Sequence, residues 1–433
     1  MDDTTKILTN RLSDFFPDGK ESRAPYTDSE IYKLSSLLEY SNPRWSKVPR
    51  TYIILRTIGY LSYLDKLIDV GFSDYWLPIT KDSFPSCLPP SAWAKFMNAQ
   101  DLLLTKSMDL ERGEKGQHYY VKRDERLPFE RKTVLGVGRF SQVDKVVSLI
   151  SFKEYARKRV RRGSVFGSQL TKDMKHFTTE IEILKRLKHR HIVEFVGSYT
   201  DPKYVGLIMS PVAEVDLAAY FTRADTSKYG ELRTFFGCLA SALKFLHERN
   251  VQHKDIKPGH ILVHHGNVLF TDFGLSVDFI AATSSRSTTT SEESMTPTWR
   301  YYPPEVTQYK RPNMSSDIWS LGVVFLEMIV ILKGKTIEYI DEFFTEHGSR
   351  RAYVSTNLAA LVALVEELQE TGSVSDNRAF AWIQPMLQIE PNLRPNAAEL
   401  VASITATSKE QGRSTVFCGT CCVSLDNDYL IRR

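Results

Sequence analysis

The sequence has few cysteines, little net charge and no long apolar run. Five cysteines among 433 residues are too few and too unevenly spaced for a disulfide framework. A formal net charge of +4 does not by itself indicate a nucleic-acid-binding protein. No signal peptide is recognisable, and the apolar run 321–332 is short and interrupted by Glu327. We therefore expect an intracellular chain, cytoplasmic with a nuclear location also open, that has no nucleic-acid partner and no membrane span.

The cysteines are distributed unevenly along the chain. Cys87 and Cys238 are isolated, whereas Cys418, Cys421 and Cys422 form a tight group in a polar tail. Metal binding by this group would need a further ligand, and lipidation has no C-terminal prenylation box to support it. The expectation is an unmodified, reducible tail.

Two segments in the second half of the chain suggest chemistry. Residues 253–260 read His-Lys-Asp-Ile-Lys-Pro-Gly-His, and Asp272-Phe273-Gly274 begins seventeen residues after Asp255. This order resembles the catalytic loop and the metal-binding turn of eukaryotic protein kinases. The resemblance extends over about residues 127–401, because further motifs of that family occur in the required order.

The resemblance implies a role for each polar residue of these segments. Asp255 would be the base that accepts the proton of the substrate hydroxyl, and Lys257 would steady the transferred phosphoryl group and favour Ser/Thr over Tyr substrates. Asp272 would hold Mg²⁺. His260 stands where the family has a metal-binding Asn, and imidazole is a poor ligand for Mg²⁺. We expect weakened Mg²⁺ binding and better support of activity by Mn²⁺.

Upstream, residues 135–143 resemble the glycine-rich loop that covers the nucleotide phosphates, although taken alone they fit an ordinary hairpin turn. Glycine lets the backbone approach phosphate oxygens closely. The nucleotide-contacting residues of this loop would be Gly136, Val137, Gly138, Ser141 and Val143.

Residues 155–160 fit the family's next strand, in which Ala156 and the phosphate-binding Lys158 share one face. Arg157 and Arg159 fall on the other face, where we expect them to be solvated. The basic run 157–162 could instead be a nuclear-localisation or nucleic-acid patch.

The ion-pair partner of Lys158 should lie on the helix that follows. Glu180 is the candidate, because Glu182 falls on roughly the opposite helical face and is expected to be a surface charge. Residues 207–212 resemble the hinge between two lobes, with Met209 beside the adenine and Val212 in the backbone that pairs with it. Asp216 either hydrogen-bonds the ribose or caps a helix.

The segment from Asp272 to Glu305 resembles the family's activation segment, and its polar run 283–291 should be mobile when unmodified. Thr298 matches a threonine that contacts the catalytic Asp in Ser/Thr kinases. Glu305 is expected to pair with Arg394 in the interior, and Asp317 is expected to brace the catalytic-loop backbone.

These observations predict an α+β fold with two kinase-like lobes, a small β-rich one and a large helical one, preceded by a helical region. The helical region is predicted from apolar residues at helical spacing, such as Ile31, Leu34, Leu37 and Leu38, and then Ile58, Leu61, Leu64, Leu67 and Ile68. The expected boundaries are a flexible N-terminus 1–27, a helical domain 28–108, a charged linker 109–126, a kinase domain 127–405 and a polar tail 406–433.

Three function classes follow from this reading. The first is an ATP-dependent Ser/Thr protein kinase that uses Mg²⁺ or Mn²⁺ and acts on a protein substrate. The second is a catalytically silent, nucleotide-binding scaffold, and His260 separates it from the first. The third makes the N-terminal helical region the functional part. The oligomeric state is not indicated by the sequence.

Overall fold

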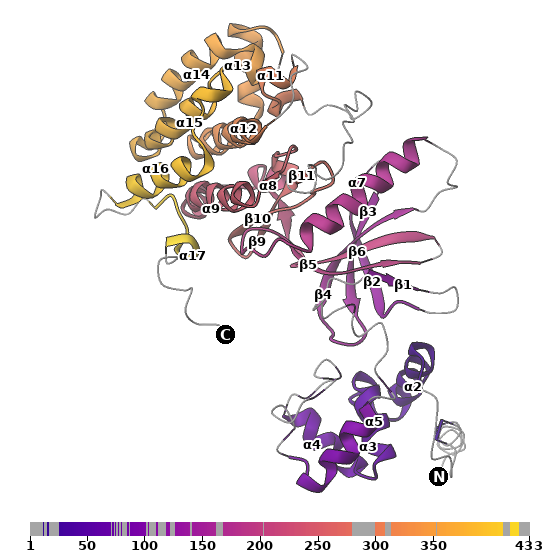
Figure 1. Ribbon diagram of the computed structural model, residues 1–433. Coiled ribbons are helices and arrows are strands. Elements are labelled where there is room, and N and C mark those ends of the chain that lie inside the picture. Colours follow the sequence, from indigo (N-terminus) through magenta and orange to yellow (C-terminus); the bar gives the residue numbers. More distant parts are fainter. Residues whose placement is uncertain are drawn as a thin grey trace. The chain divides into compact units, whose positions relative to one another are not determined.

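The computed structural model of the chain is shown in Figure 1. It divides into two compact units, one of Met1–Leu170 with Phe195–Val212 and the other of Thr171–Glu194 with Ala213–Arg433. The described residues are 12, 15–16, 26–70, 72, 74, 77, 79, 85, 87–100, 103, 110, 118–121, 126–138, 141–161, 168–201, 203–278, 299–307, 313–351, 353–409 and 416–423.

The first unit begins with short helices around an apolar cluster. They are α2 (Asp28–Ser41), α3 (Pro49–Thr57), α4 (Leu64–Asp69) and α5 (Trp93–Gln100). A capping box starts α2: the Thr27 hydroxyl accepts the Glu30 N–H at 3.3 Å, and the Thr27 N–H donates to the Glu30 carboxylate at 2.8 Å. Ile31, Leu34 and Leu38 lie on one face of α2 and are buried, as their spacing predicts.

The second predicted helical run does not form one helix. The helix α3 ends at Thr57, and Gly59 follows with φ of +79°, a conformation that an L side chain rarely adopts. The helical spacing of the apolar residues therefore continues past the point where the helix α3 ends. Of the predicted flexible N-terminus, Phe15 and Phe16 pack against the helical cluster, whereas residues 1–11, 13–14 and 17–25 lie outside the described residues.

The same unit contains a six-stranded sheet in the order β1-β5-β6-β4-β3-β2. β1 pairs parallel with β5, and the pairs β2–β3, β3–β4 and β4–β6 are antiparallel. The strands are β1 (His118–Tyr120), β2 (Phe129–Val137), β3 (Ser141–Ser148), β4 (Glu154–Arg161), β5 (Glu194–Thr200) and β6 (Tyr204–Ser210).

The stretch 109–126, expected to be a linker, contributes β1 to this sheet. Tyr119 and Val121 pack against the apolar cluster under the sheet, in which Leu110 is 1% exposed. The backbone of Leu110 lies so close to Gly197 that a Cβ on Gly197 would be 2.2 Å from the Leu110 carbonyl oxygen. Because most residues of this stretch are charged, the sequence shows no strand pattern there.

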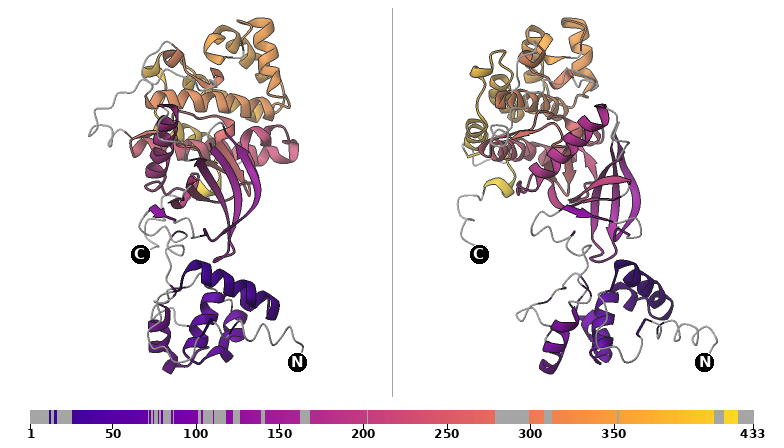
Figure 2. Two further views of the ribbon diagram at one scale, coloured as in Figure 1. Left: turned by 90° about the vertical axis from the view of Figure 1, so that its right-hand side faces the viewer. Right: turned by 45° about the vertical axis from the view of Figure 1, so that its right-hand side comes forward.

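The second unit is mainly helical, as Figures 1 and 2 show. It holds a three-stranded sheet in the order β10-β9-β7 and a two-stranded sheet of β11 and β8. Its strands are β7 (Val215–Asp216), β8 (Val251–Gln252), β9 (Ile261–His264), β10 (Asn267–Phe270) and β11 (Val277–Asp278). Its helices are α7 (Ser168–Leu184, beginning in the first unit), α8 (Leu217–Phe221), α9 (Tyr229–Glu248), α11 (Pro304–Thr307), α12 (Met314–Leu332), α13 (Glu338–His347), α14 (Leu358–Glu370), α15 (Phe380–Met386), α16 (Ala397–Lys409) and α17 (Thr420–Val423).

The helix α12 is the core of this unit. Among the described helices, it alone is long and apolar enough to cross a membrane, but 94% of its apolar window is buried inside the protein, as in a core helix. Its interior Glu327 is 1% exposed and is paired with Arg300 (Nε to Oε1, 2.7 Å) and with the Tyr301 hydroxyl (3.0 Å). Burial raises the pKa of Glu327 to about 7 against the opposing effect of Arg300. The charge in the apolar run is therefore compensated by partners rather than by water.

Candidate active site

The backbone of the catalytic loop is held by one carboxylate. Asp317, 1% exposed near the start of α12, accepts the His253 N–H at 2.8 Å and the Lys254 N–H at 2.9 Å. His247 on α9 lies 3.1 Å from the same carboxylate. Lys254 has φ of +67°, a left-handed conformation that neighbouring contacts must stabilise in a residue with a Cβ. The predicted brace is confirmed.

His253 organises the interior of this loop, a role that the sequence analysis did not assign. Its Nδ1 accepts the Asp255 N–H at 3.3 Å, so its Nε2–H donates to the Thr271 carbonyl at 3.1 Å. Its ring packs against Phe270 and Phe273 with centroids 5.4 and 4.8 Å away. Burial lowers the pKa of His253, so the ring is neutral and joins the catalytic loop to the segment that bears Asp272. The position of His253 at the start of the segment 253–260 was the one sequence feature that could have indicated this role.

Asp255 and Lys257 lie together as an acid–base pair. The Lys257 ammonium donates to Asp255 Oδ2 at 2.9 Å, and the two side chains are 22% and 12% exposed, respectively. A partly buried carboxylate beside a cation can accept a proton from a hydroxyl while the cation faces an anionic group. The roles assigned to these two residues from the sequence stay predictions.

His260 lies between the two acidic residues of the site. Its Nδ1 is 3.0 Å from the Asp255 carbonyl oxygen and 3.2 Å from Asp255 Oδ2, while its Nε2 is 3.7 Å from Asp272 Oδ2. Two acceptors facing Nδ1 place the proton there, because a neutral imidazole has one donor nitrogen. Burial lowers the pKa of His260 despite the nearby carboxylates. The lone pair of Nε2 therefore faces Asp272.

Asp272 and Gly274 form the turn after β10. Asp272 has φ of +63°, and a Cβ at Gly274 would lie 3.5 Å from Asp272 Oδ1 and 3.9 Å from Glu180 Oε2. Glu180 on α7 is 1% exposed, while Glu182 is 69% exposed and pairs with Lys185. The interpretation of Glu182 as a surface charge is confirmed, and Glu180 lies next to the turn of Asp272 and Gly274.

In the first unit, the strand register places several predicted nucleotide contacts on one face of the sheet. Lys158 pairs with Val143 on β3, and Ala156 pairs with Met209 on β6. Partners in register share a face, as do residues two apart in a strand. Lys158 is 8% exposed. Since Lys158 and Glu180 belong to different units, their ion pair stays a prediction.

The expectation that the flanking arginines are solvated is wrong. Arg157 is 8% exposed, and its guanidinium donates to Asp144 Oδ2 at 3.1 Å, while Arg159 Nε lies 3.0 Å from the same oxygen. Asp144 on β3 is fully buried and directly opposes Arg157. A buried carboxylate needs such cations to offset its lost hydration. Arg157 and the half-buried Arg159 therefore form an ion network around a buried carboxylate, so neither is a freely solvated surface charge.

The glycine-rich segment forms the β2–β3 hairpin. Gly136 pairs with Val143 and Val137 with Gln142, and the Gly138 N–H donates to the Ser141 carbonyl at 2.8 Å. This is the hairpin that both interpretations of the segment require. Residues 139–140 at its tip lie outside the described residues.

Asp216 acts as a helix cap. Its carboxylate accepts the Ala219 N–H at 2.7 Å at the start of α8, so the capping interpretation is confirmed and a ribose contact stays a prediction. Val212, in the predicted hinge, is half-buried, and its contact with adenine also stays a prediction. Thr298 and the polar run 283–291 lie outside the described residues.

The predicted pair of Glu305 and Arg394 is confirmed and is bidentate. Arg394 Nη1 and Nη2 each lie 2.7 Å from one oxygen of the Glu305 carboxylate. Burial opposes ionisation, but the hydrogen bonds and charge of Arg394 keep the pKa of Glu305 below its usual value.

A sheet with a buried lysine on one face, and a helical unit with a braced Asp-Lys loop, define a kinase-like phosphotransferase fold. The sequence profile of the protein kinase domain matches residues 129–404. The chain therefore belongs to the protein kinase family. This also confirms the predicted α+β fold.

Several relatives are Ser/Thr kinases. The chain is 32% identical over 203 residues to an Aurora kinase of Schizosaccharomyces pombe, covering 47% of this chain and 54% of the relative. It is 27% identical over 246 residues to a cAMP-dependent protein kinase catalytic subunit of Arthrobotrys oligospora, covering 57% and 44%. It is 28% identical over 276 residues to the serine/threonine-protein kinase AtPK2/AtPK19 of Arabidopsis thaliana, covering 63% and 53%. The chain spans about half the length of the curated relatives it matches.

Proposed function

We propose that the chain is an ATP-dependent serine/threonine protein kinase that transfers the γ-phosphate of ATP to hydroxyl groups of a protein substrate. The observation that carries the proposal is the Asp255–Lys257 pair, 2.9 Å apart, on a loop whose backbone is held by Asp317. Relatives that are named as serine/threonine-protein kinases support the substrate class.

Each residue of the loop has a definite task in this reaction. The Asp255 carboxylate accepts the proton of the substrate hydroxyl, and the Lys257 ammonium donates hydrogen bonds to the transferred group. Bound ATP would supply the phosphoryl group, and a divalent cation on Asp272 would neutralise its charge. Asp317 and His253 hold the loop, so that Asp255 does not have to be reordered for each turnover.

The residues present fit one hard divalent cation better than two. The oxygens of Asp272 are the ligands that Mg²⁺ prefers, whereas the atom of His260 that faces Asp272 is the imidazole Nε2. Imidazole suits softer divalent ions. We therefore expect weakened use of Mg²⁺ and a higher rate with Mn²⁺.

The first test measures transfer of γ-phosphate from ATP to a basic protein substrate, with the native chain and with Asp255→Asn. Loss of a general base lowers rates by about 10²–10⁴-fold. ATP binding is measured in parallel, because the variant should keep it. If neither chain transfers phosphate with Mg²⁺ or Mn²⁺ although both bind ATP, the chain is a nucleotide-binding scaffold.

The second test compares the rates of His260→Asn with Mg²⁺ and with Mn²⁺. Restoring an amide oxygen should raise the Mg²⁺-dependent rate and reduce the preference for Mn²⁺. The matched control is His265→Asn, because His265 is 78% exposed in the β9–β10 turn and has a positive φ that Asn tolerates. An unchanged metal preference in His260→Asn would refute the role given to His260.

A further inference from the structure

The C-terminal segment 416–423 is anchored to the helical unit rather than free of it. Phe417 is fully buried and makes edge-on contacts with Trp382 and Phe236, whose ring centroids lie 5.3 and 5.9 Å away. The Gly237 N–H on α9 donates to the Phe417 carbonyl at 2.8 Å. A Cβ at Gly237 would lie 2.6 Å from the Cβ of Cys418, so glycine is required for this close approach.

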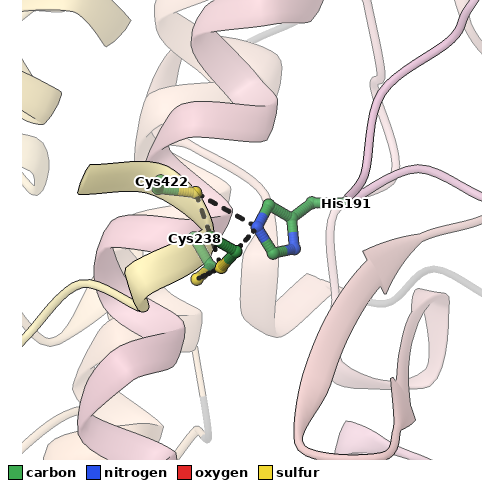
Figure 3. A group of neighbouring side chains, drawn as sticks. His191, Cys238 and Cys422 are labelled. Carbon is green, nitrogen blue, oxygen red and sulfur yellow. Dashed lines mark hydrogen bonds between the residues drawn. The ribbon is translucent and has the colours of Figure 1, made fainter. Parts of the chain in front are cut away.

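This anchoring brings four metal-ligand side chains together from three parts of the sequence. They are His191 in the loop before β5, Cys238 on α9, and Cys421 and Cys422 on α17, and one ligand atom from each lies within 4.8 Å of the others. Figure 3 shows His191, Cys238 and Cys422 pointing toward one another. All four belong to the second unit and are at least half-buried.

The spacing of these atoms fits a tetrahedral ion. His191 Nε2 lies 3.1 Å from Cys422 Sγ and 3.4 Å from Cys421 Sγ, and Cys421 Sγ lies 3.5 Å from Cys238 Sγ and 4.0 Å from Cys422 Sγ. Zinc–sulfur bonds of about 2.3 Å and zinc–nitrogen bonds of about 2.0–2.1 Å give tetrahedral edges of about 3.8 Å between sulfurs and about 3.5 Å between nitrogen and sulfur. The two sulfur–sulfur separations lie on either side of the first value, and the two nitrogen–sulfur separations are slightly shorter than the second.

His191 is oriented as a zinc ligand would be. Its Nδ1 lies 2.8 Å from the Val268 carbonyl oxygen, which can only accept, so the ring proton is on Nδ1. The Nε2 lone pair then points at the sulfurs. The backbone of His191 is also fixed, because its carbonyl accepts the Phe270 N–H at 2.9 Å. A backbone carbonyl that orients the second ring nitrogen is the usual arrangement around a metal-bound histidine.

A disulfide explains less of this arrangement. Cys238 and Cys421 have sulfurs 3.5 Å apart, well beyond the bond length of about 2.05 Å, and all five cysteines are free thiols. A disulfide would join only two of the three sulfurs. It would not explain why the third sulfur and the oriented imidazole lie beside them.

We propose that His191, Cys238, Cys421 and Cys422 form a structural zinc site that fastens the C-terminal segment to α9 and to the loop before β5. Three thiolates and one imidazole complete a tetrahedron and leave no open position, as in structural rather than catalytic zinc sites. Binding releases up to three thiol protons to solvent, and no electron is transferred. The site is separate from Asp255 and does not depend on the proposed kinase activity.

The test uses the full chain, purified under reducing conditions without chelator, and measures bound metal by mass spectrometry. We expect about one zinc ion per chain. Cys422→Ser should reduce the zinc to a small fraction of this value, whereas Cys87→Ser should keep it, because Cys87 is a half-buried cysteine of the first unit. Replacing zinc with Co²⁺ in the native chain should give thiolate-to-cobalt charge-transfer absorption.

The opposite results are equally definite. A native chain that stays metal-free after incubation with Zn²⁺ and reductant would overturn the proposal. So would zinc that Cys422→Ser and His191→Gln both retain, because the ion would then lie elsewhere. An intact mass lower by two hydrogens, with no metal bound, would assign a disulfide instead. Because the Co²⁺ spectrum needs no variant, misfolding of a variant does not affect it.

Discussion

The Asp317 brace allows a sharp prediction, because one buried carboxylate accepts two backbone N–H groups of the catalytic loop. In Asp317→Asn, the amide oxygen can accept only one of the His253 and Lys254 N–H groups, and the amide NH₂ faces the other. A hydrogen bond to a charged group contributes about 1.5–3 kcal/mol, and an unsatisfied buried donor costs about 1–3 kcal/mol. Partial relaxation of the loop leaves an expected local loss of about 2–4 kcal/mol.

Hydrogen exchange followed by mass spectrometry measures this loss directly. A decrease of about 2–4 kcal/mol in the opening free energy corresponds to exchange about 30- to 1000-fold faster in the peptide that covers residues 253–257. The control is Glu248→Gln, because Glu248 is 56% exposed and lies 3.7 Å from Lys244. Such a surface pair contributes less than about 1 kcal/mol. Unchanged exchange of the loop in Asp317→Asn would refute the brace.

Four further outcomes are expected. Arg394→Met leaves Glu305 buried without its cation and should destabilise the chain by about 3–5 kcal/mol in urea unfolding; a loss below 1 kcal/mol would contradict a buried pair. Because the pKa of Glu305 is lowered in the folded state, this stabilisation is complete above its unfolded pKa and disappears as pH falls through the folded pKa. The stability difference between wild type and Arg394→Met, measured against pH, should therefore narrow in acid. Asp216→Ala should lower the free energy of unfolding by about 1 kcal/mol in the same assay, and Asp216→Asn should lower it much less, because Asn also caps helices. Equal stability of Asp216→Ala and the native chain would contradict the cap. Asp144→Asn leaves Arg157 buried without a carboxylate and should lower the free energy of unfolding by about 3–5 kcal/mol. If the arginines were solvated, the substitution would leave the stability unchanged.

Sequence reasoning was most successful where a motif is short and local. The segment 253–260 carries Asp255 and Lys257 two residues apart, and they meet at 2.9 Å. The partners Glu305 and Arg394, distant in sequence, could be predicted only from the family resemblance. The spacing of Ile31, Leu34 and Leu38 was sufficient for α2, because a helix repeats its faces every 3.6 residues.

Sequence reasoning failed where the surroundings of a residue decide its role. Strand alternation placed Arg157 correctly on the face opposite Lys158, but could not indicate that Asp144 lies there on the neighbouring strand. Charge alone suggested solvation, whereas a buried carboxylate offsets the cost of removing an arginine from water. The strand β1 was missed for a related reason, since its stability comes from pairing with β5, about eighty residues later in the chain.

The sequence by itself therefore determined the family, the order of the kinase-like segments and the residues proposed to carry the chemistry, because these depend on local spacing. Only the tertiary structure decided which distant groups meet. It placed His260 between Asp255 and Asp272, and it added Cys238 and His191 to the cysteines of the tail. The physical reason is that coordination and burial depend on distances of a few ångströms between segments far apart in the sequence, which local patterns do not specify.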